Sequence, residues 1–259
     1  MPDLQTQNPQ NSSMIEPHQI TRDDETLDDL LHGSLKIIQK KDGYRFSVDA
    51  ILLANFIGVP KAESIIDLGT GCGIIPILLA HMTKVNKIVG VEVQEDLAEM
   101  ARRSVELNDL CRRITIFHKD LNNLKELFET ESFDMVVSNP PYRKAYSGRI
   151  NPHSQKAIAR HEIKCSLQDV LKVSRHLVKP MGKVYIVFPV VRLGDIISQH
   201  REVGLEPKKL QIVYSNINSE GKLVLIEASK GGRSGLKVLK PLFTHDKDGN
   251  PNLLETSEA

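Results

Sequence analysis

Short apolar runs alternate with longer segments of helical spacing along most of this chain. The runs are rich in β-branched residues and are bounded by turn formers, which is typical of buried strands. The strands that this pattern predicts span residues 64–68, 87–91, 114–117, 133–137, 183–188, 210–214 and 223–228. The predicted helices span residues 74–82, 94–108, 121–128, 167–178 and 193–203.

The order of these elements predicts the topology. Strands that alternate with helices form a parallel sheet with helices on both faces. The last two strands are joined by SNINSEGK, residues 215–222, which is too short for a helical crossover, so they should pair antiparallel. We therefore expect an α/β fold with a Rossmann-like, doubly wound, seven-stranded sheet, mostly parallel, with an antiparallel last strand.

The residues before the first of these strands have a pattern of their own. Residues 35–39 and 44–46 flank Lys41-Asp42-Gly43 and predict a small hairpin, and residues 48–56 predict a helix. We expect a disordered tail over residues 1–22 and an N-terminal extension over 23–60 that packs on the domain. The domain itself should span residues 61–245, with a C-terminal tail over 246–259.

Composition is that of an ordinary soluble globular protein, with 40% hydrophobic and 26% charged residues. No run approaches the roughly 18 apolar residues that a membrane span needs. The three cysteines, Cys72, Cys111 and Cys165, lack the spacing of a metal site, and their odd number argues against a disulfide framework. We expect a cytoplasmic protein with no membrane partner and no metal.

The net charge is only +1, but the charge is segregated along the chain. Residues 21–30 are acidic, whereas residues 143–161 and 228–245 contain no Asp or Glu. The first acid-free window carries Arg143, Lys144, Arg149, Lys156 and Arg160, and the second carries Lys230, Arg233, Lys237 and Lys240. Basic windows of this kind suit a nucleic-acid partner, although a solvated loop with incidental charge would look the same.

Candidate ligand-binding residues follow three of the predicted strands. In an open parallel sheet, ligands bind beyond the carboxyl ends of the strands. The first strand runs into a G-x-G-x-G loop, residues 69–73, where glycines allow tight turns and close backbone approach. Glu92 ends the second strand and could accept hydrogen bonds from a ribose, and Asp120 follows the third. Taken singly, Glu92 could be a solvated strand end and Asp120 a helix N-cap.

In this order and spacing the residues resemble the class I S-adenosylmethionine-dependent methyltransferases. The resemblance implies S-adenosylmethionine as cofactor, and carboxylates facing the ligand suit a cationic cofactor better than a pyrophosphate. It also implies a set of cofactor-binding residues along the carboxyl ends of the strands. These are Asp67, Gly69, Thr70, Gly71, Cys72, Gly73, Glu92, Val93, Asp120, Leu121 and Asn139.

The fourth strand ends in Asn139-Pro140-Pro141-Tyr142, which resembles the N-P-P-Y signature of enzymes that methylate a conjugated nitrogen. Such a nitrogen is a poor nucleophile because its lone pair is delocalised. If the Asn139 side-chain oxygen and the Pro140 carbonyl each accept one of its hydrogens, the lone pair is aimed at the methyl group. The prolines fix the backbone, and the Tyr142 ring is expected to stack on the substrate base.

Residues 143–162 and 43–54 resemble bacterial tRNA (adenine-N6) methyltransferases that modify the adenosine beside the anticodon of a valine tRNA. This resemblance implies tRNA as the partner. The expected substrate-binding residues are Tyr142, Arg143, Lys144, Arg149, Lys156 and Arg160. Three alternatives stay open: a glutamine-N5 protein methyltransferase, an rRNA or DNA amino-group methyltransferase, and a non-catalytic RNA-binding module on the same fold.

Overall fold

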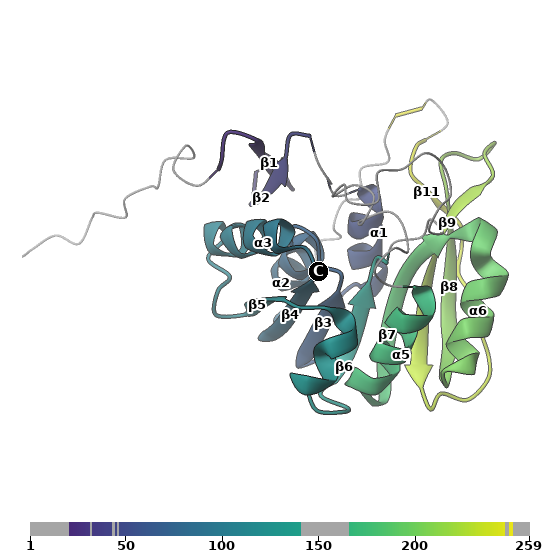
Figure 1. The fold of residues 1–259 in the computed structure, drawn as a ribbon. Helices are drawn as coiled ribbons and strands as arrows, with labels where there is room; N and C mark the ends of the chain where they lie inside the picture. Colours follow the sequence, from purple (N-terminus) through teal and green to yellow (C-terminus); the bar gives the residue numbers. More distant parts are fainter. Residues whose placement is uncertain are drawn as a thin grey trace, which may run out of the picture.

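A single large sheet with helices on both faces forms the body of the protein (Figure 1). The computed structural model describes residues 21–31, 33–42, 45, 47–140, 166–246 and 249–250. Among these residues the strand order is β10-β8-β9-β7-β6-β3-β4-β5, with β11 also paired to β8. Strand β9 is antiparallel to its neighbours β7 and β8, and the other pairings are parallel.

The seven predicted strands are all present. They are β3 (Ser64–Leu68), β4 (Lys87–Glu92), β5 (Ile114–His118), β6 (Phe133–Ser138), β7 (Val178–Pro189), β8 (Leu205–Tyr214) and β9 (Gly221–Lys230). The mostly parallel α/β sheet is thereby confirmed. Two short strands that the sequence did not predict, β10 (Lys237–Val238) and β11 (Leu242–Phe243), extend the edge beside β8.

Helices divide between the two faces of the sheet, and each face has its own apolar core. Helices α1 (Val48–Ile57) and α2 (Ile74–Met82) pack on one face, together with α3 (Glu95–Leu107). Helices α5 (Leu167–Leu177) and α6 (Leu193–Glu202) pack on the other. Side chains alternate along the strands, so that Ile65 belongs to the first core and Ile66 to the second. This double coverage explains why the parallel strands are continuously apolar.

The helix expected over residues 121–128 is instead the short 3₁₀ helix η2 (Leu121–Glu126). The Asp120 side chain caps its start by accepting a hydrogen bond from the backbone N–H of Asn122 at 2.9 Å. Leu121 and Leu124 are its buried residues. Two buried leucines three residues apart match a 3₁₀ turn, so apolar spacing alone did not separate it from an α-helix. A second 3₁₀ turn, η3 (Val190–Arg192), follows β7.

Strand β2 has a partner that the sequence did not predict. Strand β2 (Leu35–Lys40) pairs antiparallel with β1 (Glu25–Leu30), which precedes it, and the turn of this hairpin lies between Leu30 and Leu35. The predicted pairing with residues 44–46 across Lys41-Asp42-Gly43 involves residues 43, 44 and 46, which lie outside the described residues. We missed β1 because its sequence, ETLDDL, is acidic, and carboxylates are uncommon in strands.

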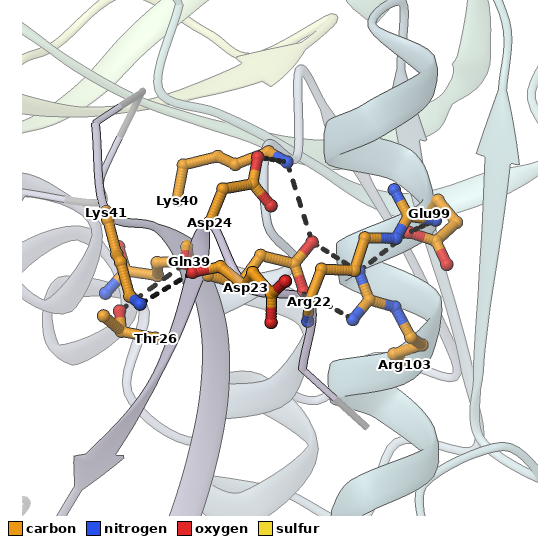
Figure 2. A network of polar contacts seen from close by, with 10 residues as sticks. Arg22, Asp23, Asp24, Thr26, Gln39, Lys40, Lys41, Glu99 and Arg103 are labelled. Carbon is orange, nitrogen blue, oxygen red and sulfur yellow. Dashed lines mark hydrogen bonds and ion pairs between the residues drawn. The ribbon is translucent and has the colours of Figure 1, made fainter. Parts of the chain in front are cut away.

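The acidic strand β1 is stabilised by basic partners on β2 and α3 (Figure 2). Glu25 is buried and accepts two hydrogen bonds from the Arg103 guanidinium, at 2.7 and 2.8 Å. Arg103 also bonds to Glu99 one turn away on α3. A bidentate Arg–carboxylate pair is geometrically specific, so this network fixes the hairpin on α3.

The sheet brings the candidate ligand-binding residues together at the carboxyl ends of β3 and β6. Strands β3, β4 and β5 extend in one direction from the centre and β6 and β7 in the other, so the chain reverses between β3 and β6. The carboxyl ends of these two strands form the topological switch point, where open α/β sheets bind their ligands. Asp67, Ser138 and the glycine loop all lie at this point.

Candidate methyltransferase active site

The glycine loop is held against the end of β4. The backbone N–H groups of Gly69 and Thr70 both donate to the Val91 carbonyl at 2.9 Å, and the N–H of Gly71 donates to Glu92 Oε2 at 2.9 Å. Gly69, Gly71 and Gly73 have φ values of 78°, 58° and 86°, in the region that favours glycine. The alternate spacing of the glycines is therefore a backbone requirement.

Close packing explains two of the glycines directly. A Cβ on Gly73 would lie 3.1 Å from the Cβ of Ala101, so Gly73 lets α2 begin close to α3. A Cβ on Gly90 would lie 2.6 Å from Ile116 Cδ1 and 3.0 Å from the Thr70 side chain. The sequence analysis did not single out Gly90, but a glycine inside an apolar strand is a signal of close approach. It makes room for the Thr70 side chain beside β4.

Asp67, the fourth residue of β3, is fully buried. Neither of its carboxylate oxygens, nor Thr70 Oγ1, makes a hydrogen bond of normal geometry with a described residue. Burial raises the pKa of Asp67 to about 7; the nearby Thr70 hydroxyl opposes this rise and the charge of Glu92 adds to it. An unpaired buried carboxylate is costly, which is characteristic of a group that has a ligand as its partner.

Glu92 is also buried, but its carboxylate is bound to backbone. Oε2 accepts from Gly71 N–H and Oε1 accepts from Gln94 N–H, both at 2.9 Å. Burial raises the pKa of Glu92 against the lowering effect of these N–H groups. Each carboxylate oxygen has a further lone pair, so Glu92 remains able to accept from a ligand hydroxyl while its orientation is fixed.

The other predicted cofactor-binding residues differ in what they can offer. Cys72 is buried in the apolar core, and burial raises the pKa of its thiol to about 12, so only its backbone is available to a ligand. Leu121 is buried beneath Asp120, whose carboxylate already caps η2. The carbonyl of Val93 lies 3.2 Å from His118 Nε2. Asp120 therefore has the N-cap role that the sequence left open, which does not occupy both of its oxygens.

Asn139 and Pro140 follow β6 directly, next to the glycine loop. Leu68 of β3 pairs with Ser138 of β6, so Asn139 continues the chain opposite Gly69. Ser138 Oγ donates to the Leu68 carbonyl at 2.7 Å in a buried hydrogen bond. The sequence did not predict this contact between β6 and β3. Its signal was a small hydroxyl residue that ends an otherwise apolar strand.

The spacing across the sheet fits a long ligand. Asn139, Gly69 and Glu92 end the adjacent strands β6, β3 and β4, and Asp120 follows the next strand, β5. At about 4.8 Å between strands, the sites from Asn139 to Asp120 span roughly 14 Å. This length accommodates an extended nucleoside with a side chain.

The remaining predicted site residues lie outside the described residues. They are Pro141, Tyr142, Arg143, Lys144, Arg149, Lys156 and Arg160. Within the described ranges, no group of three or more His, Cys, Asp or Glu side chains is arranged to hold a metal ion. No helix in that part of the chain has the length and apolar character to cross a membrane.

The comparison with protein families decides which family this site belongs to. Residues 46–189, more than half of the chain, match the methyltransferase small domain. The chain belongs to this family. The match begins before α1 and ends at the last residue of β7, so it includes the glycine loop, Glu92 and Asn139.

Curated relatives of this methyltransferase chain have a more specific name. A tRNA1(Val) (adenine(37)-N6)-methyltransferase of Porphyromonas gingivalis is 31% identical over 189 residues, which cover 71% of this chain and 73% of the relative. The protein of the same name from Parabacteroides distasonis is 27% identical over 79% of this chain and 83% of its own length.

Solved structures support the fold. A predicted O-methyltransferase from Agrobacterium tumefaciens superimposes with a TM-score of 0.61 at 22% identity, over 77% of this chain and 88% of that one. A 16S rRNA N2 methyltransferase from T. thermophilus, in complex with AdoMet and guanosine, superimposes with a TM-score of 0.54 at 17% identity, over 80% of this chain and 50% of that one. At these identities the comparison establishes the methyltransferase fold alone.

Proposed function

We propose that this methyltransferase uses S-adenosylmethionine to methylate N6 of adenine 37 in a valine tRNA. The observation that carries the proposal is the match to relatives of that name over most of their length. The side chains at the switch point support it, because they fit both the cofactor and an amino-group substrate. The glutamine-amide, rRNA and DNA alternatives, and the binding-only module, have no comparable support.

The cofactor is S-adenosylmethionine, and the acids at the site fit it. Asp67 and Thr70 have buried oxygens without a hydrogen-bond partner among the described residues, and Glu92 is oriented by two backbone N–H groups. These carboxylates would repel the phosphates of a dinucleotide but attract a cationic amino acid moiety. We assign Glu92 to the ribose hydroxyls, Asp67 with Thr70 to the amino acid end, and Asp120 to the adenine amino group. When bound, S-adenosylmethionine supplies an electrophilic methyl group on a positively charged sulfur.

Asn139 and Pro140 orient the reacting nitrogen in this proposal. The Asn139 side-chain oxygen and the Pro140 carbonyl each accept one N6 hydrogen, which directs the nitrogen lone pair away from the ring plane. Ser138 fixes the start of this segment through its hydrogen bond to the Leu68 carbonyl. No strong base is needed, because the nitrogen becomes acidic once it bears the fourth bond, and its proton can pass to either acceptor or to water.

Substrate binding is assigned to the residues that follow Pro140. We propose that Tyr142 stacks on the adenine, and that the basic residues of the first acid-free window contact phosphates. The window contains Arg143, Lys144, Arg149, Lys156 and Arg160. A tRNA substrate also agrees with the cytoplasmic location expected from the sequence, which stays a prediction.

Methylation of bacterial tRNA with labelled S-adenosylmethionine tests the function directly. After digestion to nucleosides, we expect the label in N6-methyladenosine. Asn139→Ala should lower the turnover rate by roughly a hundredfold, the usual cost of losing a group that acts at the reacting centre, with little change in cofactor affinity. Label in another nucleoside would contradict the substrate assignment. Nearly unchanged turnover in the variant would contradict the role of Asn139.

A further inference from the structure

The chain after β9, from Gly231 to Thr244, runs along the outer edge of the sheet, and we call this segment the ridge. It turns at Gly231 and runs beside β8 in the same direction, first as β10 and then as β11. Its backbone is tied to β8 at several points. The bonds run from Leu239 N–H to Leu210 O at 2.8 Å, from Thr244 N–H to Tyr214 O at 3.0 Å, from Gln211 Nε2 to Lys240 O at 3.0 Å, and from Lys208 Nζ to Arg233 O at 2.7 Å.

The four basic residues of this window differ in their environment. Lys230 is buried, and its Nζ donates to the carbonyls of Arg175 and Val178 at 3.0 Å, which caps the end of α5. It also pairs with Glu131 at 2.8 Å. Lys230 thus stabilises the fold and is not available to a binding partner.

The other three, which we call the edge triad, are Arg233, Lys237 and Lys240. All three are exposed, and none makes an ion pair with a described residue. Glu227, the last acid before the window, already pairs with Lys183 and Lys209. The edge triad therefore presents positive charge that no described residue compensates, on a backbone that the sheet holds in place.

The ridge leads toward the active site. Because β10 and β11 are parallel to β8, the chain from Lys237 to Phe243 runs toward the same end of the sheet as Asn139. Four strand spacings separate this edge from β6, or about 19 Å at 4.8 Å each. A base held at Asn139 leaves the adjoining RNA stem outside the site, within reach of charges at this distance.

We propose that the edge triad is a second RNA contact, which binds backbone phosphates of the tRNA stem next to the methylated loop. This inference rests on the proposed function. Leu236 and Val238 are also exposed on the ridge, at 37% and 64%, which would suit a protein partner instead. The uniform sign of the unpaired charges favours a polyanion, since phosphate contacts dominate RNA affinity.

A charge-matched pair of variants tests this assignment. The first combines Arg233→Ala, Lys237→Ala and Lys240→Ala. The control combines Arg112→Ala, Lys61→Ala and Lys84→Ala, which removes the same charge from exposed residues ahead of β5, β3 and β4, at the opposite end of the parallel strands. Binding of full-length tRNA, and of a short single-stranded RNA that carries the loop sequence without its stem, is measured by filter binding at several salt concentrations, alongside methylation of both RNAs.

The edge variant should bind full-length tRNA about tenfold or more weakly at low salt than the control. Its slope of log affinity against log salt should be shallower by roughly 2, at about 0.7–0.9 for each phosphate contact. KM for tRNA should rise at unchanged kcat, and both S-adenosylmethionine affinity and methylation of the stemless RNA should match the control.

Equal tRNA affinity and salt slope for the two variants, with wild-type methylation intact, would overturn the edge contact and leave the proposed function standing. Binding of the stemless RNA weakened to the same degree as that of full-length tRNA would also overturn it, because the contact assigned to the edge triad lies on the stem. A wild-type protein that methylates no tRNA would instead overturn the proposed function.

Discussion

Two aspartates on neighbouring strands at the centre of the sheet have opposite environments. Asp134 lies near the start of β6, where Oδ2 accepts from the N–H groups of Glu63 and Ser64 and from the Ser64 hydroxyl, at 2.8 to 3.0 Å. Its Oδ1 accepts from Lys179 Nζ at 2.6 Å. Asp67 lies toward the end of β3 and has no such partner among the described residues.

Their pKa values diverge accordingly. Partial burial acts to raise the pKa of Asp134, but the hydrogen bonds from Lys179, Ser64 and the backbone outweigh it and lower the pKa to about 2. Burial raises the pKa of Asp67 to about 7. The first carboxylate stabilises the fold at the amino end of the strands. The second costs stability at the carboxyl end, where a ligand can compensate for it.

Among the substitutions that test the difference between Asp67 and Asp134, Asp67→Asn has the largest expected effect. Folding raises the pKa of Asp67 from 3.8 to about 7, so the contribution of Asp67 to stability is most favourable below pH 4 and falls as pH rises to 7. Without cofactor, Asp67→Asn should therefore be more stable than the wild type at pH 8, by roughly 1–3 kcal/mol. Its affinity for S-adenosylmethionine should nevertheless fall by about tenfold or more, the cost of losing a charged hydrogen bond.

Urea denaturation between pH 4 and pH 8 and titration calorimetry measure the two effects. Asp109→Asn, at an exposed position in a left-handed backbone conformation that Asn tolerates, is the control and should leave both unchanged. A variant that is less stable than the wild type at pH 8 would show that Asp67 is a structural residue like Asp134.

Replacing Asp134 with Asn should have the opposite sign and a smaller size. Folding lowers the pKa of Asp134 from 3.8 to about 2, so its contribution is present above pH 4 and is lost as pH falls toward 2. At pH 7, Asp134→Asn should lower the free energy of unfolding by about 2 kcal/mol. The same denaturation series, extended to pH 2, should show this difference shrinking below pH 4, and cofactor affinity should stay at the wild-type value. A loss of cofactor affinity in Asp134→Asn would contradict the assignment of Asp134 to fold stability and of Asp67 to ligand binding.

Sequence alone predicted the seven main strands and the glycine loop that follows the first of them. The spacing of Gly69, Gly71 and Gly73 is visible because each adopts a backbone conformation that favours glycine. The apolar runs predicted the seven main strands because parallel, doubly covered strands have little polar content. The position of Glu92 at a strand end followed from these two facts.

The errors have physical causes that the sequence pattern does not contain. Strand β1 was missed because Glu25 is neutralised by Arg103, a residue 78 positions away in the chain. Strands β10 and β11 consist of two residues each and are held by pairing with β8, without an apolar run of their own. Whether Asp67 has a partner could not be read from its neighbours in the chain, because the answer depends on how the strands assemble.

Two buried hydroxyls at the carboxyl end of the strands differ in the same way as the two aspartates, and their substitution has the smallest expected effects. Ser138 Oγ donates to the Leu68 carbonyl at 2.7 Å, whereas Thr70 Oγ1 makes no hydrogen bond of normal geometry with a described residue.

Ser138→Ala should lower the free energy of unfolding by about 1 kcal/mol, because it removes a satisfied hydrogen bond. Thr70→Val keeps the shape of the side chain, so the cofactor-free protein should be as stable as the wild type or slightly more so. Its affinity for S-adenosylmethionine should fall about fivefold, or about 1 kcal/mol, if the hydroxyl bonds to the cofactor. Thermal unfolding and calorimetry of the two variants check these signs, and equal destabilisation by both would mean that Thr70, like Ser138, supports the fold and not the ligand.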